Sequence, residues 1–544
     1  MTETPPWWMT GVIYQIYPRS FQDTTDSGIG DLPGITRRLD YLADTLGIDA
    51  IWISPFYPSP MADFGYDVSD YTDVHPLFGS LADFDELVAE AHARELRVII
   101  DWVPNHSSDQ HPWFRAARSS RDDPKRDWYL WHDPAPDGSP PNNWLAVFGG
   151  SAWEWDEVTG QYYLHSFLKE QPDLNWRNPQ LRATMFDTVR FWLDRGADGF
   201  RVDVAHFVMK DPEFRDNPTA PGSDLMPRYG PAYETQDHVH DKAHPDSHDV
   251  YREMRAILNS YDGDRFAVGE ISLDDLDRWA AYYGDELDQL HMPFNFTLLT
   301  TPWEAAALRR SVEAVEAVVP DGGWPNFVLG NHDTPRPVCR LGQAHARIGA
   351  MLLLTLRGTP TLYYGDELGM DDVDVSPGEM QDPWEIRVPG KGRDGCRSPM
   401  LWNPEPGRGF TGPGVQPWLP FLENLDVNVA TQLDEPMSML NLYRALLEIR
   451  RASRPLRLGS YRALAHVPGQ VYGYAREDQD ETVAILLNFG DTPCEVSLAG
   501  HEHDVWLSTS MDRSGLETGP LTLRPNEGLI VRDPPVIQAS GTSG

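Results

Sequence analysis

Three acidic residues of this 544-residue chain, Asp203, Glu270 and Asp333, each stand at the end of a short apolar stretch. Arg201 precedes Asp203 by two positions, so in an extended strand both side chains project to the same face. There the arginine favours the ionised carboxylate, which is the form that acts as a nucleophile at neutral pH. A purely structural Arg–Asp pair at a strand end is the alternative. Several such carboxylates without a cluster at metal-ligand spacing indicate acid, base and nucleophilic chemistry on a sugar acetal.

These acids belong to a series of apolar segments that alternate with amphipathic helices. We expect strands at 12–17, 50–56, 97–103, 199–205, 266–271, 289–296, 327–333 and 361–364. They are apolar almost throughout, as strands of a parallel sheet covered on both faces are. Eight strand–helix units predict an α/β protein with a (β/α)₈ TIM barrel, whose active site lies at the carboxyl ends of the strands. The three acids, with His106 and His332, should therefore meet at one rim.

The strand–helix alternation is interrupted after the third strand. Residues 106–176 are loop-like and rich in proline and tryptophan, which predicts an inserted subdomain between two barrel parts at 1–105 and 177–455. Short strands separated by turns follow, which predicts a C-terminal all-β sandwich domain at 456–535. Residues 536–544 are expected to form a disordered tail.

Charge and cysteine content limit the classes of partner. The chain has 45 Lys and Arg against 83 Asp and Glu, a formal net charge of -38, which disfavours nucleic acid, anionic membranes and polyanionic substrates. A small neutral substrate is the expectation. Three scattered cysteines suit a reducing compartment, and neither a secretory signal nor a bilayer-length apolar run is visible. We therefore expect a cytoplasmic protein with no membrane partner.

Several motifs together carry a resemblance to a known family. They are GVIYQIYPRSF at 11–21, FGYDVSDY at 64–71, DWVPNH at 101–106, QPDLNW at 171–176, GFRVD at 199–203, GE at 269–270, NHD at 331–333 and GTPTLYYGDE at 358–367. In this order the sequence resembles the α-amylase superfamily, glycoside hydrolase family 13, in its bacterial α-glucosidase and oligo-1,6-glucosidase branch. The family has the same barrel, insertion and C-terminal β domain. The QPDLN run is typical of the α-glucosidase side rather than of endo-acting amylases.

The resemblance implies roles for the three acids. Asp203 would be the nucleophile, Glu270 the general acid/base, and Asp333 a third carboxylate that holds ring hydroxyls and favours the distorted transition state. A retaining mechanism needs one ionised and one protonated acid. We expect Arg201 to keep Asp203 ionised and burial among apolar neighbours to keep Glu270 protonated. No cofactor is expected for catalysis.

The resemblance also implies a substrate-binding set. Tyr66 would stack on the sugar, His106 and His332 would hydrogen-bond it, and Asp67 and Arg397 would close the far side of the glucose pocket. Phe148 and Phe167 match aromatic residues that line the aglycone entrance, with a place in the core as the alternative. Closure of the pocket would leave room for one non-reducing-end glucose and would enforce exo cleavage.

A loop at 23–31 stands where relatives carry a calcium loop. Its expected ligands are Asp23, Thr25, Ser27, the Ile29 carbonyl and Asp31. Thr25 and Ser27 replace a carboxylate and an amide oxygen, so the affinity for a divalent cation should be lower than with charged ligands. The sequence leaves open whether one structural calcium or magnesium ion binds here.

The sequence therefore predicts an exo-acting retaining α-glucosidase for short α-glucosides, with glucosyl transfer as a side reaction. Val204, directly after the nucleophile, is found in relatives that accept α-1,6 bonds, yet relatives with this valine also act on maltose, sucrose or trehalose. Linkage and oligomeric state stay open. A dedicated glucosyltransferase or sucrose isomerase is the alternative, and a non-catalytic binding relative is disfavoured because all three acids are present.

Overall fold

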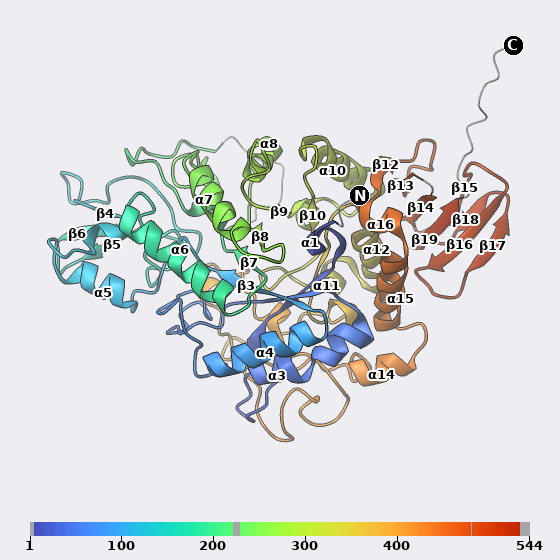
Figure 1. The fold of residues 1–544 in the computed structure, drawn as a ribbon, viewed down its shortest axis with the longest axis horizontal. Helices are drawn as coiled ribbons and strands as arrows, with labels where there is room; N and C mark the ends of the chain where they lie inside the picture. Colours follow the sequence, from blue (N-terminus) through green and yellow to red (C-terminus); the bar gives the residue numbers. More distant parts are fainter. Residues whose placement is uncertain (1–4, 221–228, 480, 534–544) are drawn as a thin grey trace, which may run out of the picture.

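The centre of the molecule is a closed ring of eight parallel strands (Figure 1). The computed structural model describes residues 5–220, 229–479 and 481–533, so the expected tail at 536–544 lies outside it. Strand order is β10-β9-β8-β7-β3-β2-β1-β11, and a bridge between Val328 and Thr361 closes the ring. The strands are β1 (Ile13–Ile16), β2 (Ala50–Ile53), β3 (Arg97–Trp102), β7 (Gly199–Val202), β8 (Phe266–Gly269), β9 (Met292–Asn295), β10 (Asn326–Phe327) and β11 (Thr361–Tyr363). The predicted (β/α)₈ barrel is confirmed.

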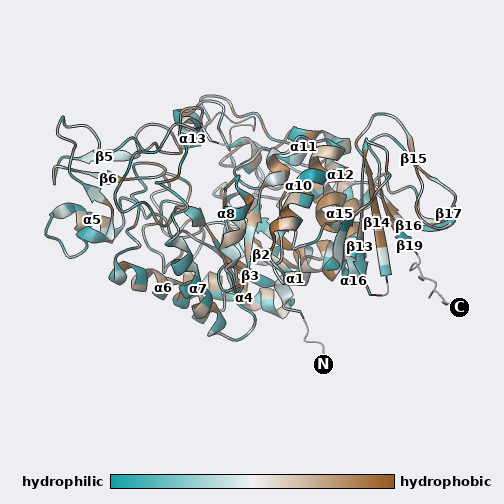
Figure 2. Ribbon diagram, turned by 90° about the horizontal axis from the view of Figure 1, so that it is seen from above, coloured by the Kyte–Doolittle hydropathy of each residue, from teal (hydrophilic) through white to brown (hydrophobic). Residues whose placement is uncertain are grey.

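Helices cover the outside of the ring, and their apolar faces point towards it (Figure 2). The longer ones are α4 (Leu81–Ala93), α6 (Pro179–Asp194), α7 (Ser247–Asn259), α10 (Ala305–Val318), α12 (Gln343–Thr355) and α15 (Met439–Ala452), and the short helix α3 (Leu32–Arg37) packs beside α4. Helix α6 shows why they form. Asn178 accepts hydrogen bonds from the first turn, proline occupies the first position, and Met185, Val189 and Trp192 are buried on one face.

Shorter helical segments connect these elements. They are α1 (Trp7–Thr10), α2 (Pro18–Phe21), α5 (Pro112–Ser119), α8 (Leu276–Ala280), α9 (Thr297–Thr300), α11 (Pro337–Leu341), α13 (Pro383–Arg387), α14 (Val429–Asp434) and α16 (Arg454–Leu458), a π-helical turn at Tyr41–Leu46, and 3₁₀ turns at Arg126–Trp128, Ala205–Phe207, Tyr233–Thr235, Ala281–Tyr283, Asp366–Leu368 and Gly395–Arg397. Across the described ranges, no helix is both long and apolar enough to cross a membrane.

Strand β7 carries the motif that precedes the first acid, and its end differs from the prediction. Gly199 is required because a Cβ there would lie 2.6 Å from the carbonyl oxygen of Phe266 on β8. The strand was expected to run to residue 205 but ends at Val202. Val204 takes φ 33°, a left-handed conformation that is costly for a β-branched residue, and turns the chain into a 3₁₀ segment.

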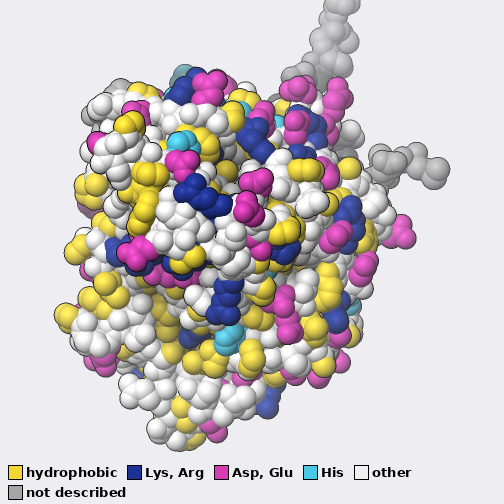
Figure 3. All heavy atoms as spheres, turned by 90° about the vertical axis from the view of Figure 1, so that its left-hand side faces the viewer, with side chains coloured by type: hydrophobic (Ala, Val, Ile, Leu, Met, Phe, Trp, Pro, Cys, Tyr) yellow, Lys and Arg dark blue, Asp and Glu magenta, His cyan; other side chains and the backbone are white. Residues whose placement is uncertain are grey.

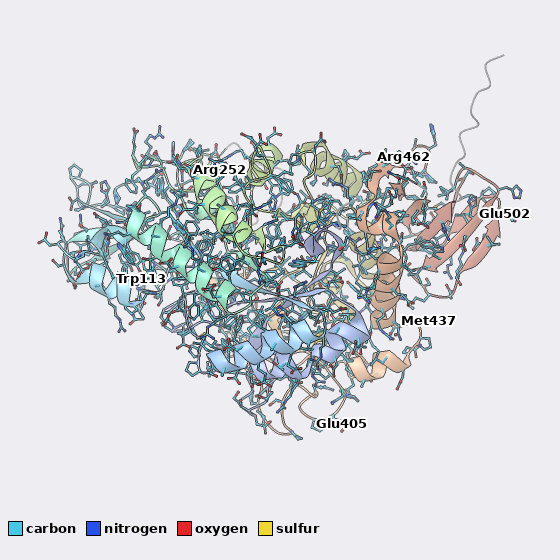
Figure 4. The ribbon with its side chains drawn as sticks, viewed as in Figure 1. Trp113, Arg252, Glu405, Met437, Arg462 and Glu502 are labelled. Carbon is cyan, nitrogen blue, oxygen red and sulfur yellow. The ribbon has the colours of Figure 1, made fainter. Side chains whose placement is uncertain are left out.

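The segment inserted after β3 forms a lobe at one end of the molecule (Figure 1). It contains α5 and a three-stranded antiparallel sheet of β4 (Trp131–His132), β6 (Gln161–Leu164) and β5 (Trp153–Asp156). Figure 4 shows Trp113 of this lobe at the opposite end from Glu502 of the C-terminal sheet. On the outer face at the lobe's end, basic side chains are interspersed with acidic ones (Figure 3), so they form no continuous basic strip there.

The C-terminal part is entirely β, as predicted. A six-stranded antiparallel sheet has the order β12-β13-β14-β19-β16-β17, and β15 pairs with β18 beside it. The strands are β12 (Ser460–Ala463), β13 (Val471–Asp478), β14 (Glu481–Asn488), β15 (Cys494–Val496), β16 (Glu502–Ser508), β17 (Gly515–Thr518), β18 (Leu521–Leu523) and β19 (Gly528–Asp533). Buried Arg476 on β13 donates to the carbonyl oxygen of Thr355 at the end of α12, which fixes the sheet to the barrel.

Candidate active site

A cavity of about 460 Å³ opens among the loops that follow the barrel strands. Seven of the eleven predicted catalytic and substrate-binding residues line it, namely Tyr66, His106, Phe148, Phe167, Asp203, Glu270 and Asp333. Four do not: Asp67, Arg201, His332 and Arg397. Each of those four lies behind the lining, and its contacts show what it does there.

Arg201 stands at the centre of the cluster of acids. One terminal nitrogen, Nη1, donates to Asp203 at 2.6 Å and to Asp101, at the end of β3, at 2.7 Å. The other, Nη2, donates to Glu270. Asp203 and Glu270 therefore lie side by side on one guanidinium, as their alternation and strand ends predicted. Asp101 had been read only as part of a strand-end motif, and its place in the cluster is new.

Burial and the shared arginine act in opposite directions on these carboxyl groups. Burial raises the pKa of Asp203 well above its ordinary value, and the Arg201 guanidinium opposes this rise. Burial likewise raises the pKa of Asp101 to about 6. One guanidinium faces three carboxylates, so the cluster readily retains a proton as the pH falls. We expected Arg201 to keep Asp203 ionised, and burial opposes that effect of Arg201 on the pKa of Asp203.

Glu270 receives a backbone donor from the strained turn described above. The amide nitrogen of Val204 lies 3.1 Å from Oε2 of Glu270, the same oxygen that accepts from Arg201. The left-handed backbone at Val204 points this amide towards β8. Both of these donors bond Oε2 of Glu270 rather than Oε1.

Asp333 is held from behind by two arginines. Its Oδ1 accepts from Arg397 at 2.9 Å and from Arg393 at 3.2 Å, and His332 Nε2 lies 3.3 Å from its Oδ2. Burial raises the pKa of Asp333, but His332 and the two guanidinium groups outweigh burial and bring it well below the ordinary value. Asp333 is thus ionised at neutral pH and fixed in orientation.

The pair that closes the cavity is not the one expected. Asp67 is fully buried and accepts from Ser59 Oγ and from the backbone nitrogens of Ala62 and Asp63, so it stabilises its own loop. Asp63, four residues earlier, faces the cavity instead and pairs with Arg393 at 2.8 Å. In the same way, Arg393 lines the cavity while Arg397 supports Asp333 from outside it.

Both predicted histidines are buried and neutral. Burial lowers the pKa of His106 to about 4 and that of His332 to about 3. His106 reaches the cavity, whereas His332 stacks on the ring of Tyr66 with centroids 5.4 Å apart and approaches its hydroxyl at 2.7 Å. Gln15 lies 2.7 Å from Nδ1 of His332, so that ring is held at both nitrogens.

Aromatic side chains form the outer wall of the cavity. Phe148 and Phe167, both from the inserted segment, meet edge to face with centroids 5.9 Å apart. Trp384, which sequence analysis missed, stacks on Phe148 with centroids 5.1 Å apart. Val204 and Tyr229 complete an apolar surface next to the acids.

Lys210 is a further residue that sequence analysis missed, after Asp63, Arg393 and Trp384. Its buried ammonium donates to Asn105 Oδ1 at 2.7 Å and to the carbonyl oxygen of Phe207, and pairs with Asp173 at 2.7 Å. These partners come from the end of β3, from the loop after Asp203 and from the inserted segment. Lys210 therefore fixes three loops of the rim to one another. A lysine seven residues after Asp203, with the aspartate of QPDLN, was the available signal.

The loop at 23–31 does not present a ligand set for a cation. Both carboxylate oxygens of Asp23 accept from donors, namely the amides of Thr25 and Gly28 and the hydroxyl of Thr411. Asp31 accepts from Gly34 and caps α3. The hydroxyls of Thr25 and Ser27 bond within the loop, the latter to the Ile29 carbonyl. Among the described residues, no group of three or more His, Cys, Asp or Glu side chains is arranged to hold a metal.

We accordingly expect chelation to leave the protein unaffected. A bound ion at 100 times its Kd would add about 2.7 kcal/mol to the free energy of unfolding, or several degrees in Tm. With N–H groups pointing at Asp23, no such gain is available. Thermal unfolding with excess EDTA and with millimolar calcium should give the same Tm within about 1 °C. A calcium-dependent rise of several degrees would contradict this.

Comparison with protein families gives one match over most of the chain. A model described as the α-amylase catalytic domain matches residues 15–459. Among curated relatives, a probable α-glucosidase of Rhizobium meliloti is 45% identical over 504 residues, covering 89% of this chain and 90% of the relative. An oligo-1,6-glucosidase of Heyndrickxia coagulans is 38% identical, covering 97% and 99%.

Solved structures agree in fold and include enzymes that transfer glucosyl groups. An α-glucosyl transfer enzyme has a TM-score of 0.92 and 42% identity, with 97% of this chain and 100% of that chain covered. The trehalulose synthase of Pseudomonas mesoacidophila has a TM-score of 0.87 and 36% identity, with the same coverage. The proteins similar to this chain thus include enzymes named as glucosidases, one named for glucosyl transfer and one named as a synthase.

Proposed function

The chain belongs to the α-amylase family of glycoside hydrolases, and from that premise we propose that it is an exo-acting, retaining α-glucosidase. Its substrates are short α-glucosides, from which it releases the terminal glucose at the non-reducing end. The reaction proceeds through a covalent β-glucosyl-enzyme, with transfer to other hydroxyl groups as a side reaction.

An ion pair in the wall of the cavity carries this proposal. Asp63 and Arg393 form a buried ion pair at 2.8 Å beyond the acids, and Arg393 is held on its other side by Asp382. Such a barrier leaves no path for a chain to continue past the glucose. An endo-acting enzyme needs a cleft open at both ends, so this geometry supports removal of a single terminal unit.

The proposed chemistry follows from the two acids on Arg201. Glu270 gives its proton to the glycosidic oxygen while Asp203 attacks the anomeric carbon, so the C–O bond to the aglycone breaks as the bond to Asp203 forms. Glu270, now ionised, removes a proton from water, whose oxygen displaces Asp203. Two inversions leave the configuration unchanged. The placement of both carboxylates on one guanidinium supports the short separation that a retaining enzyme requires.

Asp333 has a separate role in this proposal. Its carboxylate stays ionised at neutral pH because two arginines, Arg397 and Arg393, donate to it. It would accept hydrogen bonds from ring hydroxyls, which strengthen as the sugar flattens towards the oxocarbenium-like transition state. Arg397 and Arg393 are therefore residues that position Asp333.

The aromatic wall bears on the second substrate. Water and a sugar or alcohol compete for the glucosyl-enzyme, and an apolar surface of Phe148, Trp384 and Val204 favours acceptors that can pack on it. The solved α-glucosyl transfer enzyme and trehalulose synthase support transfer or isomerisation as the alternative main activity. Against isomerisation, the chain has no Arg-x-Asp-Arg motif before Gly330.

A product time course tests the proposal. Maltose, isomaltose, sucrose and trehalose are supplied at low and high concentration, and the first anomer released is followed by NMR. We expect α-glucose first, with few oligosaccharides at low concentration, and the fastest substrate identifies the preferred linkage. β-Glucose as the first product would overturn the retaining mechanism, and dominant transfer products at low concentration would favour the glucosyltransferase.

A further inference from the structure

We propose that Asp382 is a positioning residue that sets the glucose pocket and the aromatic wall at once, an inference that rests on the proposed function. Asp382 precedes α13, is fully buried, and does not line the cavity. Both of its carboxylate oxygens accept from Arg393 of the pocket, and Oδ1 also accepts from the first turn of α13 in the wall.

The first connection is to the pocket. Oδ2 of Asp382 accepts from the backbone nitrogen of Arg393 at 2.7 Å and from its Nε at 2.9 Å, and Oδ1 accepts from Nη2 at 2.7 Å. The carboxylate thus grips one edge of the guanidinium and its backbone. The terminal nitrogens then reach Asp63 and Asp333. The guanidinium cannot rotate without breaking this grip, so Asp382 orients the residue that closes the pocket.

The second connection is to the wall. Oδ1 of Asp382 also accepts from the backbone nitrogen of Trp384 at 3.1 Å, which makes Asp382 the N-cap of α13. The cap fixes the first turn of a five-residue helix and with it the indole that stacks on Phe148. Arg393 lies over both rings, 5.1 Å from the Phe148 centroid and 5.6 Å from Trp384. The carboxylate of Asp382 therefore bonds both Arg393 of the glucose pocket and Trp384 of the aromatic wall.

The negative charge of Asp382 suits it to bind Arg393 and the first turn of α13 together. Burial raises the pKa of Asp382, but Arg393 outweighs burial and brings it below the ordinary value. The ionised group can therefore accept from four donors at once. A neutral side chain would satisfy fewer of them and would leave Arg393 to be drawn towards Asp63 and Asp333.

Two substitutions that differ by one oxygen distinguish the effect of the hydrogen bonds to Arg393 from the effect of the N-cap of α13. Asp382→Ala removes both the cap and the grip on Arg393, whereas Asp382→Ser keeps a capping oxygen and loses the grip. Two readouts are used. The inhibition constant of 1-deoxynojirimycin reports on the glucose pocket alone. The ratio of kcat/KM for p-nitrophenyl α-glucoside to that for α-glucosyl fluoride reports on the wall, because fluoride has no aglycone ring.

For Asp382→Ala we expect the inhibition constant to rise about tenfold or more and the ratio to fall about threefold. For Asp382→Ser only the inhibition constant should rise. Glu379→Gln, which removes one exposed charge three residues earlier, is the matched control and should change neither. A role confined to folding would lower Tm without this split between the readouts.

The inference is overturned if Asp382→Ala leaves either readout at the wild-type value, or if both variants change the ratio equally. Should the alanine variant not fold, the serine variant decides, since an unchanged inhibition constant would overturn the grip on Arg393. Wild-type protein that cleaves neither substrate would overturn the proposed function instead, and this is measured first.

Discussion

Asp203→Asn is expected to lower kcat on p-nitrophenyl α-glucoside by about 10⁴-fold or more, because the amide cannot form the glucosyl ester. Asparagine has the same shape, and its oxygen can still accept from Arg201, which donates to Oδ1 of Asp203 at 2.6 Å. The loss should therefore be chemical rather than structural. Steady-state kinetics with thermal unfolding in parallel measures both, and Tm should change little compared with the loss of rate.

A control and a rescue make this test specific. Asp211→Asn, eight residues later, removes a carboxylate that pairs with Arg215 outside the cavity, and should keep most of the activity. Asp203→Gly leaves space beside the anomeric carbon, so azide with α-glucosyl fluoride should give β-glucosyl azide. Turnover of Asp203→Asn near the wild-type rate, or azide product with the α configuration, would contradict the assignment of Asp203 as nucleophile.

The barrel could be predicted because its strands are buried on both faces and read as apolar runs. Seven of the eight expected strands contain an observed one, and the expected strand at 327–333 shares only Phe327 with β10. Two strands of the C-terminal domain, β12 and β17, were missed. They are the two edges of the six-stranded sheet and expose much of their surface, so their sequences lack apolar alternation. The early end of β7 was invisible because valine at 204 favours strands, yet takes φ 33° here.

The acids were predictable because parallel topology alone brings strand ends together. The acid–arginine pair of the pocket, Asp63 with Arg393, was not predictable, because it depends on loop conformation. Phe64 and Gly65 take positive φ of 48° and 112°, which puts Asp63 and Tyr66 into the cavity and turns Asp67 beneath it. Gly65 cannot change, since a Cβ would lie 2.9 Å from the carbonyl oxygen of Pro55.

The expected cation loop at 23–31 is a second case in which loop conformation could not be predicted from the sequence. Spacing of oxygen-bearing residues at 23, 25, 27, 29 and 31 matches a cation loop, but spacing does not fix where each oxygen points. In the folded loop the backbone amides of Thr25 and Gly28 donate hydrogen bonds to the Asp23 carboxylate, and Asp31 is the N-cap of α3. The oxygen atoms expected to bind a cation therefore accept hydrogen bonds from groups of the protein itself.

Glu270→Gln should lower kcat/KM on maltose by about 10³-fold while lowering cleavage of α-glucosyl fluoride far less. The second glucose of maltose leaves as an alkoxide unless the glycosidic oxygen is protonated, whereas fluoride departs with little help from an acid. In the wild type, Arg201 and the backbone amide of Val204 donate to Oε2 of Glu270. Glutamine keeps an oxygen that can accept from both of these donors.

Asp274→Asn is the matched control for this variant, since Asp274 is an exposed carboxylate four residues later in the same loop. It should keep wild-type rates on both substrates. Azide separates the two steps further, because it needs no general base when it attacks the glucosyl-enzyme. With Glu270→Gln, azide should accelerate release from the fluoride and give α-glucosyl azide. Equal losses on maltose and fluoride would contradict the role of Glu270 as acid and would place its effect in the support of Arg201 and Asp203.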